Sequence, residues 1–326
     1  MSKPKRSKKS FADCVWPAAS FVQRDIPPRP WMVEGCIPAP SIGLLYAWRG
    51  AGKTLTAMDF ALRVSRGEPW LDYKVPRPYA TLYVDGEMPL PDLRSRLIAQ
   101  SGPLGPPRNL FVLASEDLAV DHRNINLARP EDRAEFVQMI LALDKEYETK
   151  IELIVLDNWT TLIRGLDGND SAALDDLKDW CKLLRHGERS LLFVHHTGKS
   201  GAQRGTSARE DIIDYSIKLL GENGPEHFEW DKMRTGRVDP DEFDMHMVKD
   251  ASGKYITLER CEPKRAGRQP KHDDAVLTYL VEHGASRHGE IAEALSLDRK
   301  SVSRALNRLC AAERVSWLAD GQYCSS

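Results

Sequence analysis

The sequence predicts an α/β fold with a mostly parallel β-sheet, followed by a small C-terminal winged helix-turn-helix domain. Between residues 41 and 258, short apolar runs alternate with segments of helical spacing, a pattern typical of a parallel sheet covered by helices. A polar stretch with two prolines then interrupts the pattern. We therefore expect four parts: a basic, flexible tail (1–30), a core (31–260), a basic linker (261–271) and the winged helix-turn-helix (272–326).

The core elements follow from hydrophobic spacing. Five nearly continuous apolar runs predict buried strands: Ile42–Ala47, Ala80–Val84, Leu110–Leu113, Ile151–Leu156 and Ser190–His195. Segments with a helical period lie between them: Lys53–Val64, Pro91–Gln100, Glu131–Tyr147 and Ala172–Leu184. Four further runs are expected to extend one edge as antiparallel strands: Asp214–Leu220, His227–Met233, Phe243–Val248 and Tyr255–Leu258.

Composition excludes several classes of protein. The chain has 326 residues, 41% of them hydrophobic and 29% charged, which is typical of soluble globular proteins. The apolar runs are far shorter than the ~20 residues of a membrane span, so we expect no membrane association and a cytoplasmic location. With 46 Lys and Arg against 48 Asp and Glu, any surface for nucleic acid must be local. Six widely spaced cysteines predict reduced thiols rather than a zinc site or disulfides.

The strongest motif is AWRGAGKT, which ends the first apolar run and opens a helix. Glycines at 50 and 52 let backbone N–H groups turn toward a phosphate at a helix N-terminus. Lys53 is expected to reach the β- and γ-phosphates, and the Thr54 hydroxyl to hold Mg²⁺. ATP and Mg²⁺ are therefore the expected cofactors. The expected nucleotide-binding residues are Ala47 (where the pattern has glycine), Trp48, Arg49, Gly50, Ala51, Gly52, Lys53, Thr54 and Leu55.

Three later positions complete the predicted site. Asp157 ends a buried strand, where ligands bind in α/β sheets, and is expected to hold Mg²⁺ through water. No acid follows it, so the base must come from elsewhere. Glu87, at the exit of another strand, is expected to orient the attacking water; Asp85 is the alternative, with a structural role favoured for it. Because adjacent strand residues face opposite ways, His196 rather than His195 is expected to sense the γ-phosphate, unless both only cap the strand.

Taken together, the stretches WRGAGKT, LYVDGEMP, IVLDN and FVHHTGKSG resemble the RecA-fold ATPases, in particular the hexameric replicative helicases of the RepA and DnaB type. The resemblance covers about residues 31–237 and implies a RecA-like P-loop NTPase core. It matches Glu87 to the catalytic glutamate, Asp157 to the Mg²⁺ aspartate and His196 to the sensor.

Within the same resemblance, the KMRTG stretch is similar to a Lys-x-Arg hairpin that one subunit inserts into its neighbour's site. Arg234 would then neutralise charge on the γ-phosphoryl group, with Lys232 beside it. This implies a homo-oligomer, a hexamer favoured, with the active site between subunits. The alternative is a basic surface hairpin.

Two segments are candidates for DNA contact. The loop Gly198–Arg209 is glycine-rich, and its composition fits the phosphate backbone of single-stranded DNA or a plain mobile loop; the expected contacts are Lys199, Arg204 and Arg209. In the predicted winged helix-turn-helix (272–326), a helix through about Cys310 carries positive residues at four-residue spacing, as a recognition helix for duplex DNA does. Its expected contacts are Arg299, Lys300, Ser303, Arg304 and Arg308. The alternative is a winged helix used for protein contact.

The function that these features predict is a ring helicase, driven by ATP along single-stranded DNA, in replication of a plasmid or other mobile element. A second hypothesis is a nucleotide-switched DNA-binding regulator or loader that never unwinds DNA. A third is a RecA-like recombination or defence ATPase.

Overall fold

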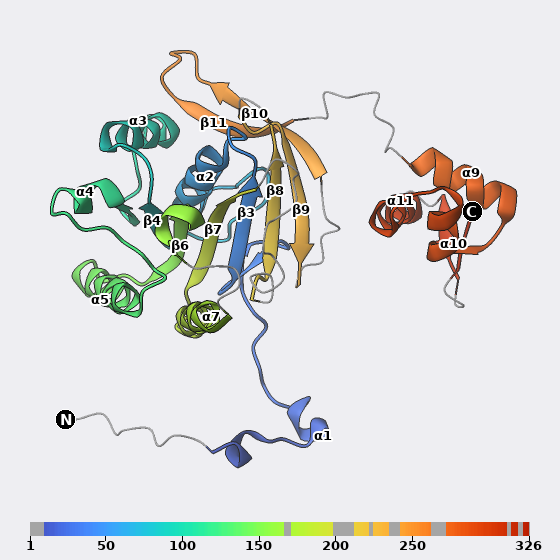
Figure 1. Ribbon diagram of the computed structural model, residues 1–326, viewed down its shortest axis with the longest axis horizontal. Helices are drawn as coiled ribbons and strands as arrows, with labels where there is room; N and C mark the ends of the chain where they lie inside the picture. The colour runs from blue at the N-terminus through green and yellow to red at the C-terminus, as the bar shows by residue number, and fades with distance from the viewer. Residues whose placement is uncertain are drawn as a thin grey trace. The chain divides into compact units, whose positions relative to one another are not determined.

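The computed structural model describes residues 10–165, 171–197, 212–221, 224–234, 242–261, 272–311, 314–318 and 322–325 (Figure 1). The chain divides into two compact units, Met1–Cys261 and Glu262–Ser326, which are described separately below. Among the described residues, no helix combines the length and the apolar content that crossing a bilayer requires.

The first unit is built on a nine-stranded sheet of order β11-β10-β9-β8-β3-β7-β6-β4-β5. The predicted α/β class with a mostly parallel sheet is confirmed. Six strands are parallel to their neighbours in this group: β3 (Ile42–Ala47), β4 (Ala80–Asp85), β5 (Leu110–Ala114), β6 (Ile151–Asp157), β7 (Ser190–His196) and β8 (Tyr215–Leu220). Three antiparallel strands extend the edge: β9 (His227–Met233), β10 (Glu242–Lys249) and β11 (Ile256–Cys261).

One strand direction was predicted wrongly. Strand β8 was expected among the antiparallel strands, but it pairs in parallel with β3 and becomes antiparallel only to β9. A parallel pair requires a crossover between its strands, and the chain between β7 and β8 has room for one. The antiparallel extension therefore begins one strand later than expected.

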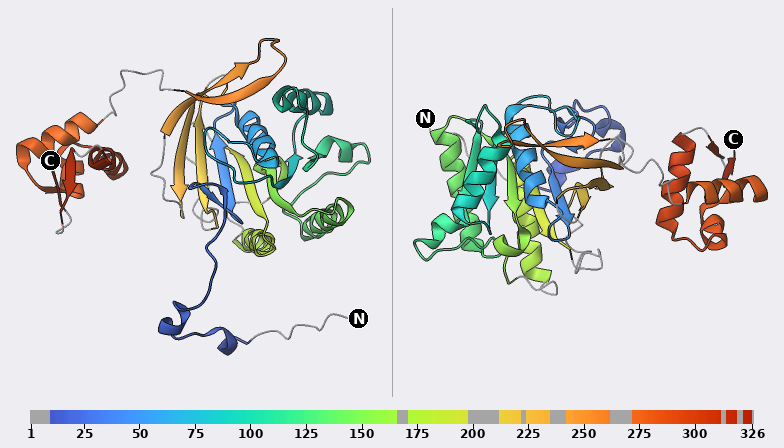
Figure 2. Two further views of the ribbon diagram at one scale, coloured as in Figure 1. Left: turned by 180° about the vertical axis from the view of Figure 1, so that it is seen from behind. Right: turned by 90° about the horizontal axis from the view of Figure 1, so that it is seen from above.

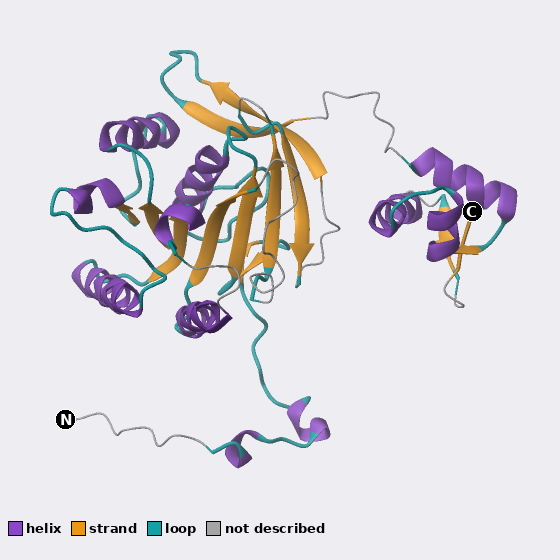
Figure 3. Ribbon diagram, in the orientation of Figure 1, coloured by secondary structure: helices purple, strands orange, loops and turns teal. Residues whose placement is uncertain are grey.

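Helices cover both faces of this sheet (Figures 1 and 3). Helices α2 (Lys53–Arg66) and α3 (Leu90–Ser101) pack on one face, with Leu45 and Leu192 of the strands beneath them. On the other face, α5 (Pro130–Glu146), α6 (Trp159–Leu162) and α7 (Ser171–His186) pack over Leu44 and Phe193. Successive strand residues thus alternate between the two cores, as the period of a strand requires. A short helix, α4 (Ser115–Ala119), follows β5.

Several short elements before the sheet were not predicted. A 3₁₀ turn, η1 (Ala12–Cys14), and one turn of helix, α1 (Ala18–Phe21), lie in an exposed segment. Strands β1 (Trp31–Val33) and β2 (Ile37–Pro38) then form a separate antiparallel pair. Segments this short contain no full period of hydrophobic spacing, so pattern analysis cannot detect them.

The described part of the second unit contains three helices and a small sheet, which Figure 2 shows from two sides. The elements are α9 (Asp273–His283), β12 (Ser286–Arg287), α10 (His288–Ala294), α11 (Arg299–Ala311), β13 (Val315–Trp317) and β14 (Gln322–Ser325). Its core includes Val276, Leu280, Ile291, Val302 and Leu306. Residues 319–321, between β13 and β14, lie outside the described residues, and the winged-helix assignment stays a prediction.

Candidate active site

The phosphate-binding loop joins the carboxyl end of β3 to the first residue of α2. Gly50 and Gly52 have φ angles of 83° and 80°, in the left-handed region that side chains disfavour. Gly52 also has no room for a side chain, because a Cβ there would lie 2.3 Å from Cδ of Pro225, just before β9. The loop therefore needs glycine at position 52 for both conformation and space.

Lys53 lies inside the loop with only 5% of its surface exposed. Its Nζ donates hydrogen bonds to the backbone oxygens of Ala47 (3.0 Å) and Trp48 (2.7 Å). Burial lowers the pKa of Lys53 to about 8, and the nearby Asp157 and Glu87 carboxylates oppose that shift. A phosphate in the loop would supply the anionic oxygens that stabilise this buried cation.

Asp157 ends β6 and is 3% exposed. Its carboxylate accepts hydrogen bonds from the Tyr83 hydroxyl (2.7 Å) and the Thr54 side chain. Burial raises the pKa of Asp157, while these hydrogen bonds and Lys53 oppose the rise. Thr54 and Asp157 thus bring a hydroxyl and a carboxylate oxygen together beside the loop, and these are ligand types that suit Mg²⁺ and its retained waters. The residues present fit the cofactor that the loop implies.

Glu87 lies in a turn directly after β4, and the Asp85 side chain fixes the conformation of this turn. The Asp85 carboxylate accepts the backbone N–H groups of Met88 (2.7 Å) and Glu87 (3.3 Å). Burial is the main cause that raises the pKa of Asp85 to about 6. Strands β4 and β6 place Asp85 opposite Asp157. Asp85 therefore shapes the turn, and Glu87 is the carboxylate that this turn presents beside the nucleotide loop.

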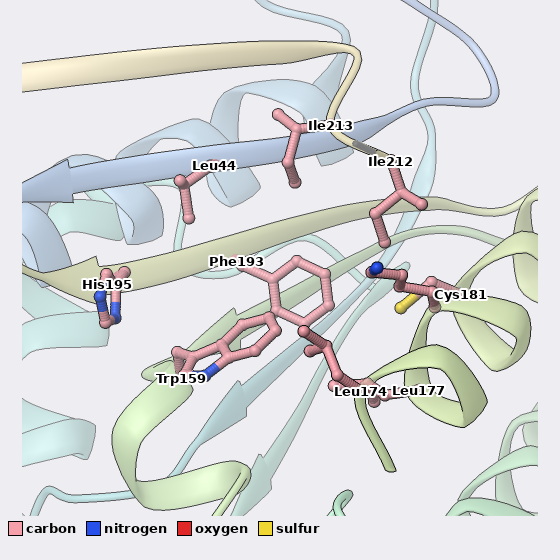
Figure 4. Close-up of a pocket in the computed structure, with 10 residues that line it drawn as sticks. Leu44, Trp159, Leu174, Leu177, Cys181, Phe193, His195, Ile212 and Ile213 are labelled. Atoms are coloured by element: carbon pink, nitrogen blue, oxygen red, sulfur yellow. The ribbon is translucent and has the colours of Figure 1, made fainter. Parts of the chain in front are cut away.

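The two histidines at the end of β7 face opposite sides of the sheet. His196 pairs with Ala47 across β3, and its Nε2 lies 3.8 Å from Oε2 of Glu87. Burial lowers the pKa of His196, as do Lys53 and Arg49, and Glu87 opposes them. His195 instead lines a small apolar cavity with Phe193 and Trp159 (Figure 4). At about 20 Å³, that cavity has space for little more than one water molecule.

Asn158 is a site residue that the sequence analysis missed. Its Nδ2 donates to Oε2 of Glu87 at 2.5 Å and lies 3.3 Å from Nε2 of His196. In the sequence, this position had been considered only because it is not an acid. Its place directly after a buried strand that ends in Asp157 was the available signal, since side chains there share the edge of the sheet with the nucleotide loop.

The structure does not bring Arg234 to the P-loop of its own chain. Its backbone N–H donates to the oxygen of Asp214 (2.8 Å), just before β8 begins. Strand β8 starts opposite Gly43 of β3, whereas the P-loop follows the far end of β3. Lys232 lies on β9 opposite Ser216, near the same amino end. Both residues therefore lie at the end of the sheet where β3 and β8 begin, whereas the nucleotide loop lies where β3 ends.

The residues expected to contact DNA are only partly covered by the structure. Lys199, Arg204 and Arg209 lie outside the described residues, as does the side chain of Lys300. On α11, Arg299 is exposed, and Ser303 and Arg304 are half-buried. Arg308 forms a double hydrogen bond with the Asp273 carboxylate at 2.8 and 3.0 Å. Arg308 thus joins α11 to α9, which is a structural role in addition to the predicted one.

Comparison with known proteins places this site in a family. A family model described as an AAA domain matches residues 5–202, more than half of the chain. No curated protein matches the sequence. Among solved structures, the chain is similar to the KaiC-like protein PH0186 from the hyperthermophilic archaeon Pyrococcus horikoshii OT3. The identity is 15% and the TM-score 0.46, over 71% of this chain and 98% of that one. The range matched by the family model contains Lys53, Glu87, Asp157 and His196.

Proposed function

This chain belongs to the AAA domain family of ATPases, and from that premise we propose that it is an ATP-driven motor on single-stranded DNA. It works as a ring of subunits, for which we favour a hexamer. Its role is that of a RepA-like helicase in replication of a plasmid or other mobile element. One observation carries the proposal. Four side chains converge at the carboxyl ends of adjacent strands: Lys53, Asp157, Glu87 and His196. Arg234 lies at the other end, where β8 begins.

The converging residues suit hydrolysis of a phosphoanhydride. Lys53 would bind the β- and γ-phosphates from inside the loop, and Thr54 and Asp157 are the groups that would hold Mg²⁺. When bound, Mg²⁺ neutralises charge on the phosphate oxygens. The Glu87 carboxylate, 3.8 Å from His196, orients the attacking water and accepts its proton. His196 lies where it can contact the γ-phosphate, since its strand position pairs with the start of the loop.

Arg234 supports a site completed by a second subunit. An arginine that stabilises charge in the transition state of phosphoryl transfer accelerates the reaction by about 10³–10⁵-fold. Because Arg234 lies at the amino end of the strands, away from the P-loop of its own chain, its proposed role is in the site of a neighbouring copy. A closed ring provides that arrangement for every subunit.

A second candidate function is a nucleotide-switched DNA-binding regulator or loader. The separate C-terminal unit favours it, because α11 carries Arg299, Ser303 and Arg304 on a short helix of the kind that enters the major groove. In that case hydrolysis resets an assembly and does not separate strands. Strand displacement distinguishes the two functions.

The test is steady-state ATPase activity across protein concentration, with and without single-stranded DNA. We expect stimulation by single strands, a steep rise with concentration, and loss of activity in Glu87→Gln and in Arg234→Ala. Lys254→Ala, an exposed cation in the β10–β11 connection, is the matched control and keeps full activity. ATPase activity that is indifferent to DNA would favour the switch over the motor.

Mixing two inactive variants tests the shared site directly. Glu87→Gln retains Arg234, and Arg234→Ala retains Glu87, so a mixed ring contains some sites with both residues. At equal amounts, about a quarter of the sites are complete if subunits mix at random. Recovered ATPase activity supports the shared site. Activity that stays at the level of the separate variants would place the chemistry within one subunit.

A further inference from the structure

We propose that Asn158 is a positioning residue, whose side-chain amide holds the Glu87 carboxylate beside His196. The inference rests on the proposed ATPase function and deepens it, because it identifies what orients the carboxylate that meets the attacking water. Neither the family match nor the motif pattern assigns a role to this position.

Hydrogen bonds fix which end of the Asn158 amide faces the site. Its Oδ1 accepts the backbone N–H of Thr161 at 3.2 Å and caps helix α6. The Nδ2 group is therefore the one directed at Glu87 and His196. A flipped amide would place two acceptor oxygens 2.5 Å apart at Glu87 and two donors together at Thr161, and both arrangements are repulsive.

The same amide also approaches the ring of His196. An amide nitrogen carries two hydrogens: one is donated to Oε2 of Glu87 at 2.5 Å, and the other points to Nε2 of His196 at 3.3 Å. When Nε2 accepts this hydrogen, the neutral ring of His196 carries its proton on Nδ1, a buried atom without a hydrogen-bond partner among the described residues. Asn158 thus connects the expected base and the expected sensor through a single group.

Burial and exposure show why Glu87 needs such a partner. Asn158 is 2% exposed, and its position is set by the α6 cap. The Glu87 side chain is 61% exposed; its backbone is held by Asp85, but its carboxylate extends beyond that turn. A hydrogen bond between a charged acceptor and a buried, fixed donor restricts the carboxylate to one place. Misplacement of a reacting group by about 1 Å costs on the order of 100-fold in rate.

Two substitutions separate this contact from the helix cap. Asn158→Ser keeps a good N-cap residue but is too short to donate to Glu87. Asn158→Asp keeps the length and the cap acceptor but replaces the donor with a second carboxylate. Asn126→Ser is the matched control, because Asn126 likewise bonds a backbone N–H (Arg164, 2.9 Å) and carbonyl (Arg164, 3.2 Å), away from the site.

We expect kcat to fall by about 10- to 100-fold in both Asn158 variants, the effect of losing a hydrogen bond to a charged group. The KM for ATP and the affinity for ADP should change by less than about 3-fold, because Lys53 and the loop remain. Asn126→Ser should leave kcat unchanged. A kcat that stays the same or rises in Asn158→Ser would overturn the proposal.

A spectroscopic measurement tests the contact without turnover. In ¹⁵N-histidine NMR, with His196 assigned by its loss in His196→Gln, the wild-type ring should show the Nδ1–H tautomer. Asn158→Ser should shift the Nε2 resonance. An unchanged His196 signal in Asn158→Ser would overturn the inference. If wild-type protein hydrolysed no more ATP than Glu87→Gln, the proposed ATPase function would fail. The His196 signal would then still show whether the Asn158 amide lies between Glu87 and His196 as proposed.

Discussion

Two buried aspartates lie at opposite ends of the parallel strands. Asp157, 3% exposed, follows the carboxyl end of β6, and Asp214, 6% exposed, precedes β8. The Asp214 carboxylate accepts the backbone N–H of Ile42 at 2.8 Å and lies 3.5 and 3.4 Å from the guanidinium groups of Arg29 and Arg185. Asp157 receives hydroxyl donors from Tyr83 and Thr54, and burial raises its pKa.

The partners of the two aspartates show that the sheet has a stabilising end, where the strands begin, and an end with the candidate active site, where they finish. Two arginines and a backbone N–H compensate the charge of Asp214, so this aspartate stabilises the fold where the strands begin. The charge of Asp157 is less well compensated, and its partners are groups that a metal ion can replace or join. The raised pKa of Asp157, beside Thr54 and the P-loop, therefore fits a position where a cation completes the structure.

The largest effect that tests this comparison is expected from Asp157→Asn. We expect Mg²⁺-dependent ATPase activity to fall by at least about 100-fold, because an amide binds the hydrated ion poorly. Thermal stability without nucleotide should stay the same or rise, since the variant removes a buried charge. ATPase assays over a range of Mg²⁺ concentrations and thermal unfolding measure the two effects. If Asp157→Asn were inactive because it was unfolded, Asp157 would have a structural role like that of Asp214, and the contrast between the two aspartates would fail.

Asp214→Asn should give the opposite result. Losing a charged acceptor should lower the free energy of unfolding by about 2 kcal/mol, while the ATPase activity per folded molecule stays unchanged. Urea titration measures the stability, and activity is normalised to the folded fraction. Arg29→Ala, which removes one of the two guanidinium groups, serves as the control and should have a smaller effect. A loss of activity without a loss of stability would contradict the structural role.

Asp85 provides the smallest and most graded test. Burial raises its pKa from 3.8 to about 6, so the folded chain binds this proton more tightly than the unfolded chain does. The resulting stability is present below pH 3.8 and is lost as the pH rises through about 6. Allowing for partial hydration, its size is on the order of 1–2 kcal/mol.

Asp85→Asn should remove that part of the pH dependence and still accept the N–H of Met88. Urea titrations at intervals between pH 4 and 7 compare the two proteins. Equal slopes of the unfolding free energy against pH in the two proteins would mean that burial does not raise the pKa of Asp85. The charge of Asp85 would then be compensated, as that of Asp214 is.

Most of the first unit could be predicted because its strands are continuous apolar runs. Strand β3, Ile42–Ala47, was predicted to the residue, since both of its faces are buried and turn-forming residues bound it. The direction of β8 could not be predicted, because strand direction depends on which neighbour a strand joins. The β1–β2 pair, of three and two residues, was too short to detect.

The site was predictable where one segment supplies all its parts, and less so where it depends on distant contacts. The P-loop is contiguous, so its lysine, threonine and glycines could be assigned from their order. The Asn158–Glu87 contact joins residues 71 positions apart, and no local pattern indicates it. Arg308 shows the same limit: four-residue spacing predicted a DNA contact, and it could not indicate the hydrogen bonds to Asp273, which is 35 residues away.

The contact between Gly52 and Pro225 has a consequence for engineering this protein. Pro225 fills the space that a side chain at position 52 would need, so the nucleotide loop and the segment before β9 fit each other as a matched pair. A chimera that receives a foreign P-loop must also receive the matching segment around Pro225. Exchanging only one of them would cause a collision or leave a gap, even if every catalytic residue were kept.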